Sequence, residues 1–207
     1  MARYCRIKVV FAILEKLEIT DSYHGKKIWH SQVAPGSFGK LKELRIAFCG
    51  AVETVFPCGV WSNFKRLEVL SVQYCDSLQE IYQVQEEINV EETNVVAVFE
   101  FTELHIQGLH NLKHIWNKDP QQGVAFPHLR SVKVSNCKVL KDLFSASIGK
   151  GPLQLEDINI KNCCMMEEII KSEVAGEAIS NLISFPSLIS IDLLKLPTLS
   201  KFLFRKL

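Results

Sequence analysis

Several features that would point to common functional classes are absent from this sequence of 207 residues. Its 24 lysines and arginines balance 23 aspartates and glutamates, which removes the usual electrostatic reason to expect nucleic acid or an anionic membrane as a partner. No run of about 18 apolar residues occurs, so we expect no membrane span. The N-terminal residues show no small-residue cleavage site typical of a secretory signal. We therefore expect a cytoplasmic protein.

Motifs for catalysis and for metal binding are also lacking. No G-x-S-x-G elbow is present, and no C-x-x-C pair suggests a zinc site. His110 and His114 are four residues apart, but the glutamate of an H-E-x-x-H motif is not there. We expect no enzyme activity and hence no catalytic residues, no cofactor and no bound metal.

What the sequence does contain is a recurring pattern of apolar residues. The stretch FPHLRSVKVSNCKVLKDLF has a period of two at Val132 and Val134, which is typical of a short strand. From Cys137 onward its period is three, which is typical of a turning loop. One such turn cannot bury its own apolar face, so the sequence should hold several. The positions equivalent to Val132, called anchors below, are Leu17, Leu44, Leu70, Leu104, Ile158 and Ile191.

The spacing of these anchors predicts the fold. Successive anchors lie between 26 residues (Leu44 to Leu70) and 34 residues (Leu70 to Leu104) apart, around the leucine-rich-repeat period of about 20–29. We predict an α/β solenoid, an irregular leucine-rich-repeat horseshoe of about seven repeats with parallel strands on its concave face. The connectors carry little helix signal, so the convex side should be irregular or short-helical. The predicted repeats of this single domain cover residues 11–37, 38–63, 64–98, 99–125, 126–151, 152–184 and 185–207.

Four of the seven cysteines occupy one position of the pattern. Cys49, Cys75, Cys137 and Cys163 each follow the second apolar residue of a predicted strand by three residues, a position that takes Asn or Cys in leucine-rich repeats. We expect buried thiols that pack as small apolar groups. Stacked turns would bring them within disulfide range, but a reducing compartment disfavours that alternative. Cys164 should face the opposite way from Cys163.

Two connectors are longer than the others. Residues 83–98 hold four glutamates and no basic residue, and residues 171–184 are mildly acidic and rich in small side chains. Both should be solvated loops. The acidic connector is interpreted either as a tolerated insertion or as a docking surface for a basic partner.

The predicted strands also define a candidate binding face. Side chains alternate along a strand, so the neighbours of the buried anchors should point outward, three on each of seven strands. That number suits a protein partner better than a small molecule. The candidate concave protein-binding residues are Glu18, Arg45, Ser71, Gln73, His105, Gln107, Lys133, Ser135, Asn159, Lys161 and Asp192.

Several phrases give the sequence a specific resemblance. A Phe-Pro lead at Phe126, a strand ending at Cys137 and an L-x-x-(I/L)-(F/W) segment ending at Phe144 follow one another, and KIWH and HIWN occur at Lys27 and His114. In these respects the chain resembles the C-terminal leucine-rich-repeat region of plant intracellular nucleotide-binding disease resistance proteins of the coiled-coil class. The resemblance extends over essentially the whole chain.

The resemblance implies a role in plant defence and innate immunity. The partner would be a pathogen effector, a guarded host protein or the receptor's own nucleotide-binding domain, and binding to that domain would contribute to autoinhibition. The family's phosphate loop is missing, because SIGKGPL has no preceding Gly at the right distance and no Ser or Thr after its Lys. We therefore expect a fragment of a larger receptor or a truncated gene product. A leucine-rich-repeat adaptor or truncated regulatory protein outside immunity, or a nonfunctional remnant, remains an alternative.

Overall fold

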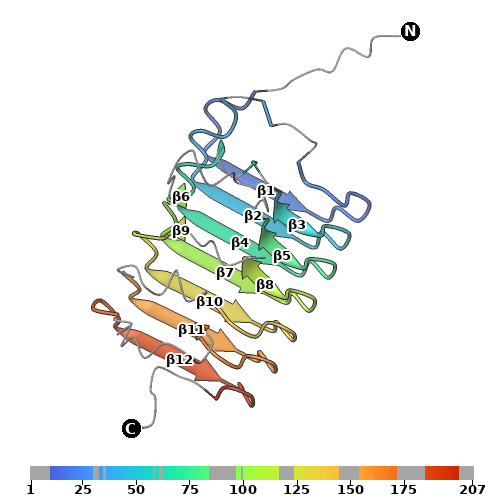
Figure 1. Ribbon diagram of the computed structural model, residues 1–207. Helices are drawn as coiled ribbons and strands as arrows, with labels where there is room; N and C mark the ends of the chain where they lie inside the picture. The colour runs from blue at the N-terminus through green and yellow to red at the C-terminus, as the bar shows by residue number, and fades with distance from the viewer. Residues whose placement is uncertain are drawn as a thin grey trace, which may run out of the picture.

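A seven-stranded parallel sheet is the largest element of the computed structural model (Figure 1). Its strands follow one another in chain order, and each pairs in register with the next, so that Leu44 of one strand lies beside Leu70 of the following one. The strands are β1 (Lys16–Thr20), β2 (Glu43–Ala47), β4 (Val69–Gln73), β7 (Glu103–Gln107), β10 (Ser131–Ser135), β11 (Asp157–Lys161) and β12 (Ser190–Leu194). The structure describes residues 10–29, 33–34, 36–57, 59–60, 63–83, 97–98, 100–116, 124–144, 154–171 and 185–200.

The predicted anchors form the core beneath this sheet. Leu70 and Val132 are fully buried, as are the partner residues two positions later, Val72 and Val134. Because side chains alternate along a strand, burial of these residues turns the intervening residues outward. The parallel strands and their inward positions are therefore as predicted. The anchors of the two edge strands differ: Ile191 is 39% exposed and Leu17 is only partly buried, because β12 and β1 each have a neighbouring strand on one side only among the described residues.

Each strand of the sheet ends in the same tight turn. The residue that directly follows the strand has a positive φ in all seven turns. These residues are Asp21, Phe48, Tyr74, Gly108, Asn136, Asn162 and Lys195. The N–H groups of the first six donate to the last strand carbonyl of the next turn, for example from Phe48 to Gln73 at 3.0 Å. This repeated bond turns the chain sharply away from the sheet and links neighbouring turns.

The cysteine column supports the same turns. Cys49, Cys75, Cys137 and Cys163 are buried free thiols, and each donates to the last carbonyl of its own strand, as Cys75 Sγ does to Gln73 at 3.3 Å. Burial raises the pKa of the Cys75 thiol to about 11, so it is protonated at neutral pH. Cys164 is exposed, as predicted.

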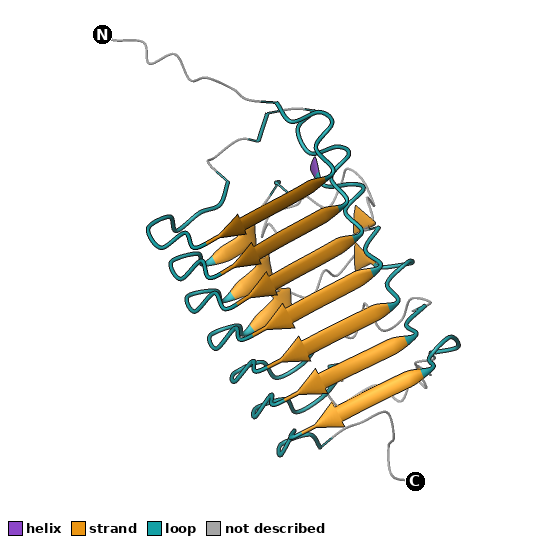
Figure 2. Cartoon of the chain, turned by 180° about the vertical axis from the view of Figure 1, so that it is seen from behind, coloured by secondary structure: helices purple, strands orange, loops and turns teal. Residues whose placement is uncertain are grey.

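A second layer of short parallel strands lies behind the main sheet, which corrects the prediction of an irregular or short-helical convex side. Strands β3 (Thr54–Phe56), β5 (Glu80–Tyr82) and β8 (His114–Trp116) form one sheet, and β6 (Ala97–Val98) pairs with β9 (Val124–Ala125). The described residues contain almost no helix (Figure 2). The apolar doublets that close each turn are short enough to pair as three-residue strands, and this pairing satisfies their backbone groups without a helix.

Aromatic side chains pack along the inner side of this second layer. Phe56 stacks on Tyr82 with ring centroids 4.8 Å apart, and Phe101 lies over Phe126 at 6.1 Å. At the N-terminal end, Trp29 meets both Phe38 and Phe64 at 5.3 and 5.1 Å. This aromatic spine comprises Trp29, Phe38, Phe56, Phe64, Tyr82, Phe101 and Phe126, all buried. The Phe residues of this spine thus serve as core packing between turns.

Two of the sequence predictions fall mainly outside the described residues. Most of the acidic connector (84–96) and most of the second connector (172–184) belong to this part, so their roles stay predictions. Among the residues that are described, no helix has the length and apolar character needed to cross a membrane.

Candidate protein-binding face

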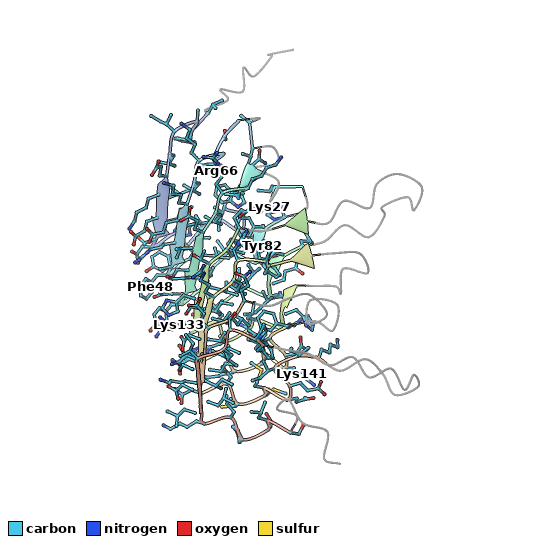
Figure 3. The ribbon with its side chains drawn as sticks, turned by 90° about the vertical axis from the view of Figure 1, so that its left-hand side faces the viewer. Lys27, Phe48, Arg66, Tyr82, Lys133 and Lys141 are labelled. Carbon is cyan, nitrogen blue, oxygen red and sulfur yellow. The ribbon has the colours of Figure 1, made fainter. Side chains whose placement is uncertain are left out.

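The outward side chains of the seven-stranded sheet form a continuous surface, called the strand face below. Neighbouring strands lie about 4.8 Å apart, so six steps from β1 to β12 span about 29 Å. Phe48 and Lys133 lie on this side of the molecule, whereas Lys141 lies toward the opposite side (Figure 3). The parallel register places equivalent residues of successive strands in straight rows across the face.

All eleven predicted binding residues lie on this face, and their role in binding stays a prediction. They are distributed as Glu18 on β1, Arg45 on β2, Ser71 and Gln73 on β4, His105 and Gln107 on β7, Lys133 and Ser135 on β10, Asn159 and Lys161 on β11, and Asp192 on β12. Ser71 is only 5% exposed and accepts a hydrogen bond from Gln73 Nε2 at 3.0 Å. Ser71 therefore helps to position the Gln73 side chain and offers little surface to a partner.

The polar groups at the β11–β12 end already bind one another. Lys161 Nζ lies 2.7 Å from Asp192 Oδ2, and Asn159 Nδ2 donates to the same oxygen at 3.1 Å. These contacts use much of the hydrogen-bonding capacity that a partner would need. A new ligand here would have to displace them, which lowers the gain from binding.

The middle of the strand face is different, because basic side chains occupy one row there. Arg45, His105 and Lys133, called the basic strip below, lie on β2, β7 and β10, with buried Ser71 between the first two. Arg45 pairs with Glu43 on its own strand. Lys133 is exposed, and no described carboxylate lies within salt-bridge distance of it. The basic strip thus carries a cation that a partner could neutralise.

The position of His105 in this strip affects its titration. Partial burial lowers its pKa, the charges of Lys133 and Arg45 lower it further, and Glu103 opposes them. A histidine whose folded-state pKa lies below the unfolded value of about 6.5 binds protons more readily when the chain is unfolded. His105 therefore costs the fold stability as the pH falls through and below about 6.5, and not above it.

We expect His105→Gln to reduce the loss of stability between pH 7.5 and pH 5.5. The measurement is the urea midpoint of unfolding at both pH values for the wild type and the variant. His24→Gln removes an exposed histidine from a turn outside the sheet and serves as the matched control. If His105→Gln leaves the difference between the two midpoints unchanged, the basic strip does not disfavour the protonated ring.

Sequence reasoning missed an exposed aromatic pair beside this strip. Phe48 and Tyr74 directly follow β2 and β4, and their rings stack with centroids 5.0 Å apart and an interplanar angle of 10°. They remain 47% and 39% exposed. Both have positive φ values, 55° and 51°, a conformation that is uncommon for bulky residues.

A signal for this pair was present in the sequence. Each of these aromatics directly precedes a cysteine of the repeated pattern. At the equivalent position the other turns have Asp21, Gly108, Asn136, Asn162 and Lys195, which are small or polar. Asn, Asp and Gly tolerate the left-handed conformation, whereas Phe and Tyr have no local reason to be there. Comparison of this one column across the turns would have identified them.

Comparison with known proteins gives a match to one protein family. No curated protein and no solved structure matches the chain. A family model does match, described as "Plant disease resistance protein RPS2-like, leucine-rich repeats", over residues 13–164. This match covers 152 of the 207 residues, including β1 to β11 of the main sheet. The chain therefore belongs to the leucine-rich-repeat family of RPS2-like plant disease resistance proteins.

Proposed function

We propose that the chain is a solenoid of about seven leucine-rich repeats that serves as the protein-binding module of a plant disease resistance protein. Its strand face recognises a pathogen effector or a guarded host protein in the cytoplasm. Within a complete receptor, the same repeats also contact the nucleotide-binding domain and contribute to autoinhibition. The module binds and does not catalyse.

The observation that carries this proposal is the in-register outward face of seven strands. It provides three outward positions on each strand, over a core whose apolar side chains are already buried beneath the sheet. Mixed charges and exposed polar groups on such an area suit a protein surface, and membership of the resistance-protein family supports a role in defence. The proposed absence of catalysis rests on the lack of catalytic motifs in the sequence.

The experiment is to express the chain in leaves and to measure the growth of a bacterial pathogen. The variants are the wild type, the strand-face double variant Arg45→Glu/Lys133→Glu, and the control Lys27→Glu. Lys27 is exposed, and its backbone pairs with that of Thr54 in the second layer. The substitution Lys27→Glu therefore changes the charge of the chain away from the strand face. We expect wild type and Lys27→Glu to alter pathogen growth equally, and the double variant to lose the effect.

Two results would count against the proposal in different ways. A wild-type chain with no effect on pathogen growth would favour an adaptor or regulatory protein outside immunity. An effect that survives in the double variant, with all three proteins equally abundant in the leaf, would place recognition on a surface other than the strand face. Autoinhibition is tested separately by co-precipitation with the nucleotide-binding domain of a full-length receptor.

A further inference from the structure

We infer, on the basis of the proposed function, that the part of the strand face from β2 to β10 binds an acidic protein segment that carries one bulky apolar side chain. The acidic groups would lie over the basic strip of Arg45, His105 and Lys133. The apolar side chain would pack on the aromatic pair, Phe48 and Tyr74.

The charge pattern selects an acidic ligand for this region. Lys133 is exposed with no salt bridge to a described carboxylate, whereas Lys161 on the neighbouring strand is held by Asp192 at 2.7 Å. His105 lies between Arg45 and Lys133 and is influenced by both of their charges. A carboxylate placed here would meet the charge of Lys133 without displacing an ion pair to a described carboxylate, so the gain from binding is larger than at Lys161.

The aromatic pair supplies a firm apolar contact beside that charge. Tyr74 lies directly over Gly108, because a Cβ on Gly108 would come within 2.6 Å of the Tyr74 ring carbon Cδ1. Phe48 stacks on the other side of Tyr74, so the two rings and the glycine form a column that continues across β2, β4 and β7. Rings that are already stacked lose little freedom when a partner covers them, and aromatic residues often dominate binding energy.

The dimensions of this region suit a short extended segment. Arg45 and Lys133 are three strand steps apart, about 14 Å, and Phe48 follows Arg45 by three residues, at most about 10 Å along the chain. About four or five extended residues cover such a distance. One carboxylate and one large apolar side chain can therefore reach both contacts from a single stretch of backbone.

The same combination of cations and aromatic rings could serve a single-stranded nucleic acid. The next row of the strand face argues against that partner, because Glu43, Glu103 and Asp157 border the basic strip on the side away from the aromatic pair. A phosphate backbone would meet these carboxylates, whereas a peptide with only one or two acidic groups avoids them. We therefore argue for a protein segment and include the nucleic acid in the test.

The test selects peptides from a random dodecapeptide phage library on the purified wild-type chain. The dissociation constants of selected peptides are then measured by fluorescence anisotropy for wild type, Lys133→Glu, Phe48→Asn/Tyr74→Asn and Lys27→Glu. Asn is the residue that the chain itself uses at Asn136 and Asn162, so the double substitution preserves a turn that tolerates positive φ. Circular dichroism confirms that each variant is folded. A single-stranded oligouridylate is measured in parallel.

We expect the selected peptides to be net acidic and to contain a large apolar or aromatic residue. Binding should weaken about tenfold or more in Lys133→Glu and in Phe48→Asn/Tyr74→Asn, and stay unchanged in Lys27→Glu. Neutral or basic peptides, or peptides that bind all variants equally, would overturn the inference. A further variant, Asn159→Lys/Asp192→Lys, is measured with these peptides; affinity lost there and kept in the other variants would overturn the inference while leaving a protein-binding strand face intact. Oligouridylate binding that is tighter than that of the peptides and lost in the same variants would assign the site to nucleic acid.

Discussion

Val132→Asp is expected to destabilise the central part of the chain severely. Val132 is fully buried on β10, between Leu104 of β7 and Ile158 of β11. The substitution loses about 1.5–3 kcal/mol of apolar burial and adds a penalty of several kcal/mol for a buried, unpaired carboxylate. The free energy of unfolding should fall by about 4 kcal/mol or more, a large part of the roughly 5–15 kcal/mol of a typical domain. Urea unfolding followed by circular dichroism measures this change.

The adjacent residue provides the control for this prediction. Lys133→Asp introduces the same side chain one position further along β10, where the native side chain is exposed on the strand face. We expect its urea midpoint to stay close to that of the wild type. Leu70→Asp and Ile158→Asp should repeat the effect of Val132→Asp on β4 and β11. Equal destabilisation by Val132→Asp and Lys133→Asp would mean that the inward and outward faces are assigned wrongly.

The main sheet could be predicted because each of its strands alternates within a repeated frame. On β4, Leu70 and Val72 are apolar at spacing two, and Cys75 follows three residues later. The same arrangement on neighbouring turns allows only one register if every anchor is to be buried. Local pattern and global packing therefore agree, which makes the strand positions and their facing readable from sequence alone.

The second layer could not be predicted in the same way. Strands such as β3 (Thr54–Phe56) are three residues long, so they contain too few positions to show a period of two. Val55 and Phe56 are both buried, and a buried doublet of this kind is compatible with strand, loop or short helix. Pairing with β5 of the next turn decides between them, and that contact is set by the stacking of turns.

The candidate site was predictable as a face but not as a set of contacts. Alternation along each strand places Lys133 and Lys161 on the same surface. It does not show that Asp192 holds Lys161 while Lys133 has no such partner among the described residues. Those differences arise from side chains on adjacent strands. The stacking of Phe48 on Tyr74 likewise depends on two turns having the same backbone conformation.

Trp29→Ala is expected to destabilise the N-terminal end of the aromatic spine by about 3–5 kcal/mol. Trp29 is 7% exposed, contacts Phe38 and Phe64 at 5.3 and 5.1 Å, and donates a hydrogen bond from Nε1 to the Val55 carbonyl at 2.7 Å. The substitution leaves a cavity among these rings and removes a buried bond between consecutive turns. The urea midpoint should fall, and hydrogen exchange should increase first at the amides of β1 and β2.

Two further variants show whether the destabilisation comes from the buried position of Trp29 or from the loss of any aromatic side chain. Trp29→Phe keeps a ring in the spine but loses the bond to Val55, so its midpoint should lie between those of the wild type and Trp29→Ala. Tyr23→Ala removes an aromatic side chain that is 61% exposed nearby in the chain, and its midpoint should stay at the wild-type value. If Trp29→Ala and Tyr23→Ala shift the midpoint equally, Trp29 does not join the first turn to the spine. Faster exchange confined to β1 and β2 would show that each turn is stabilised mainly by its direct neighbours. In such a stack the terminal strands unfold before the central ones.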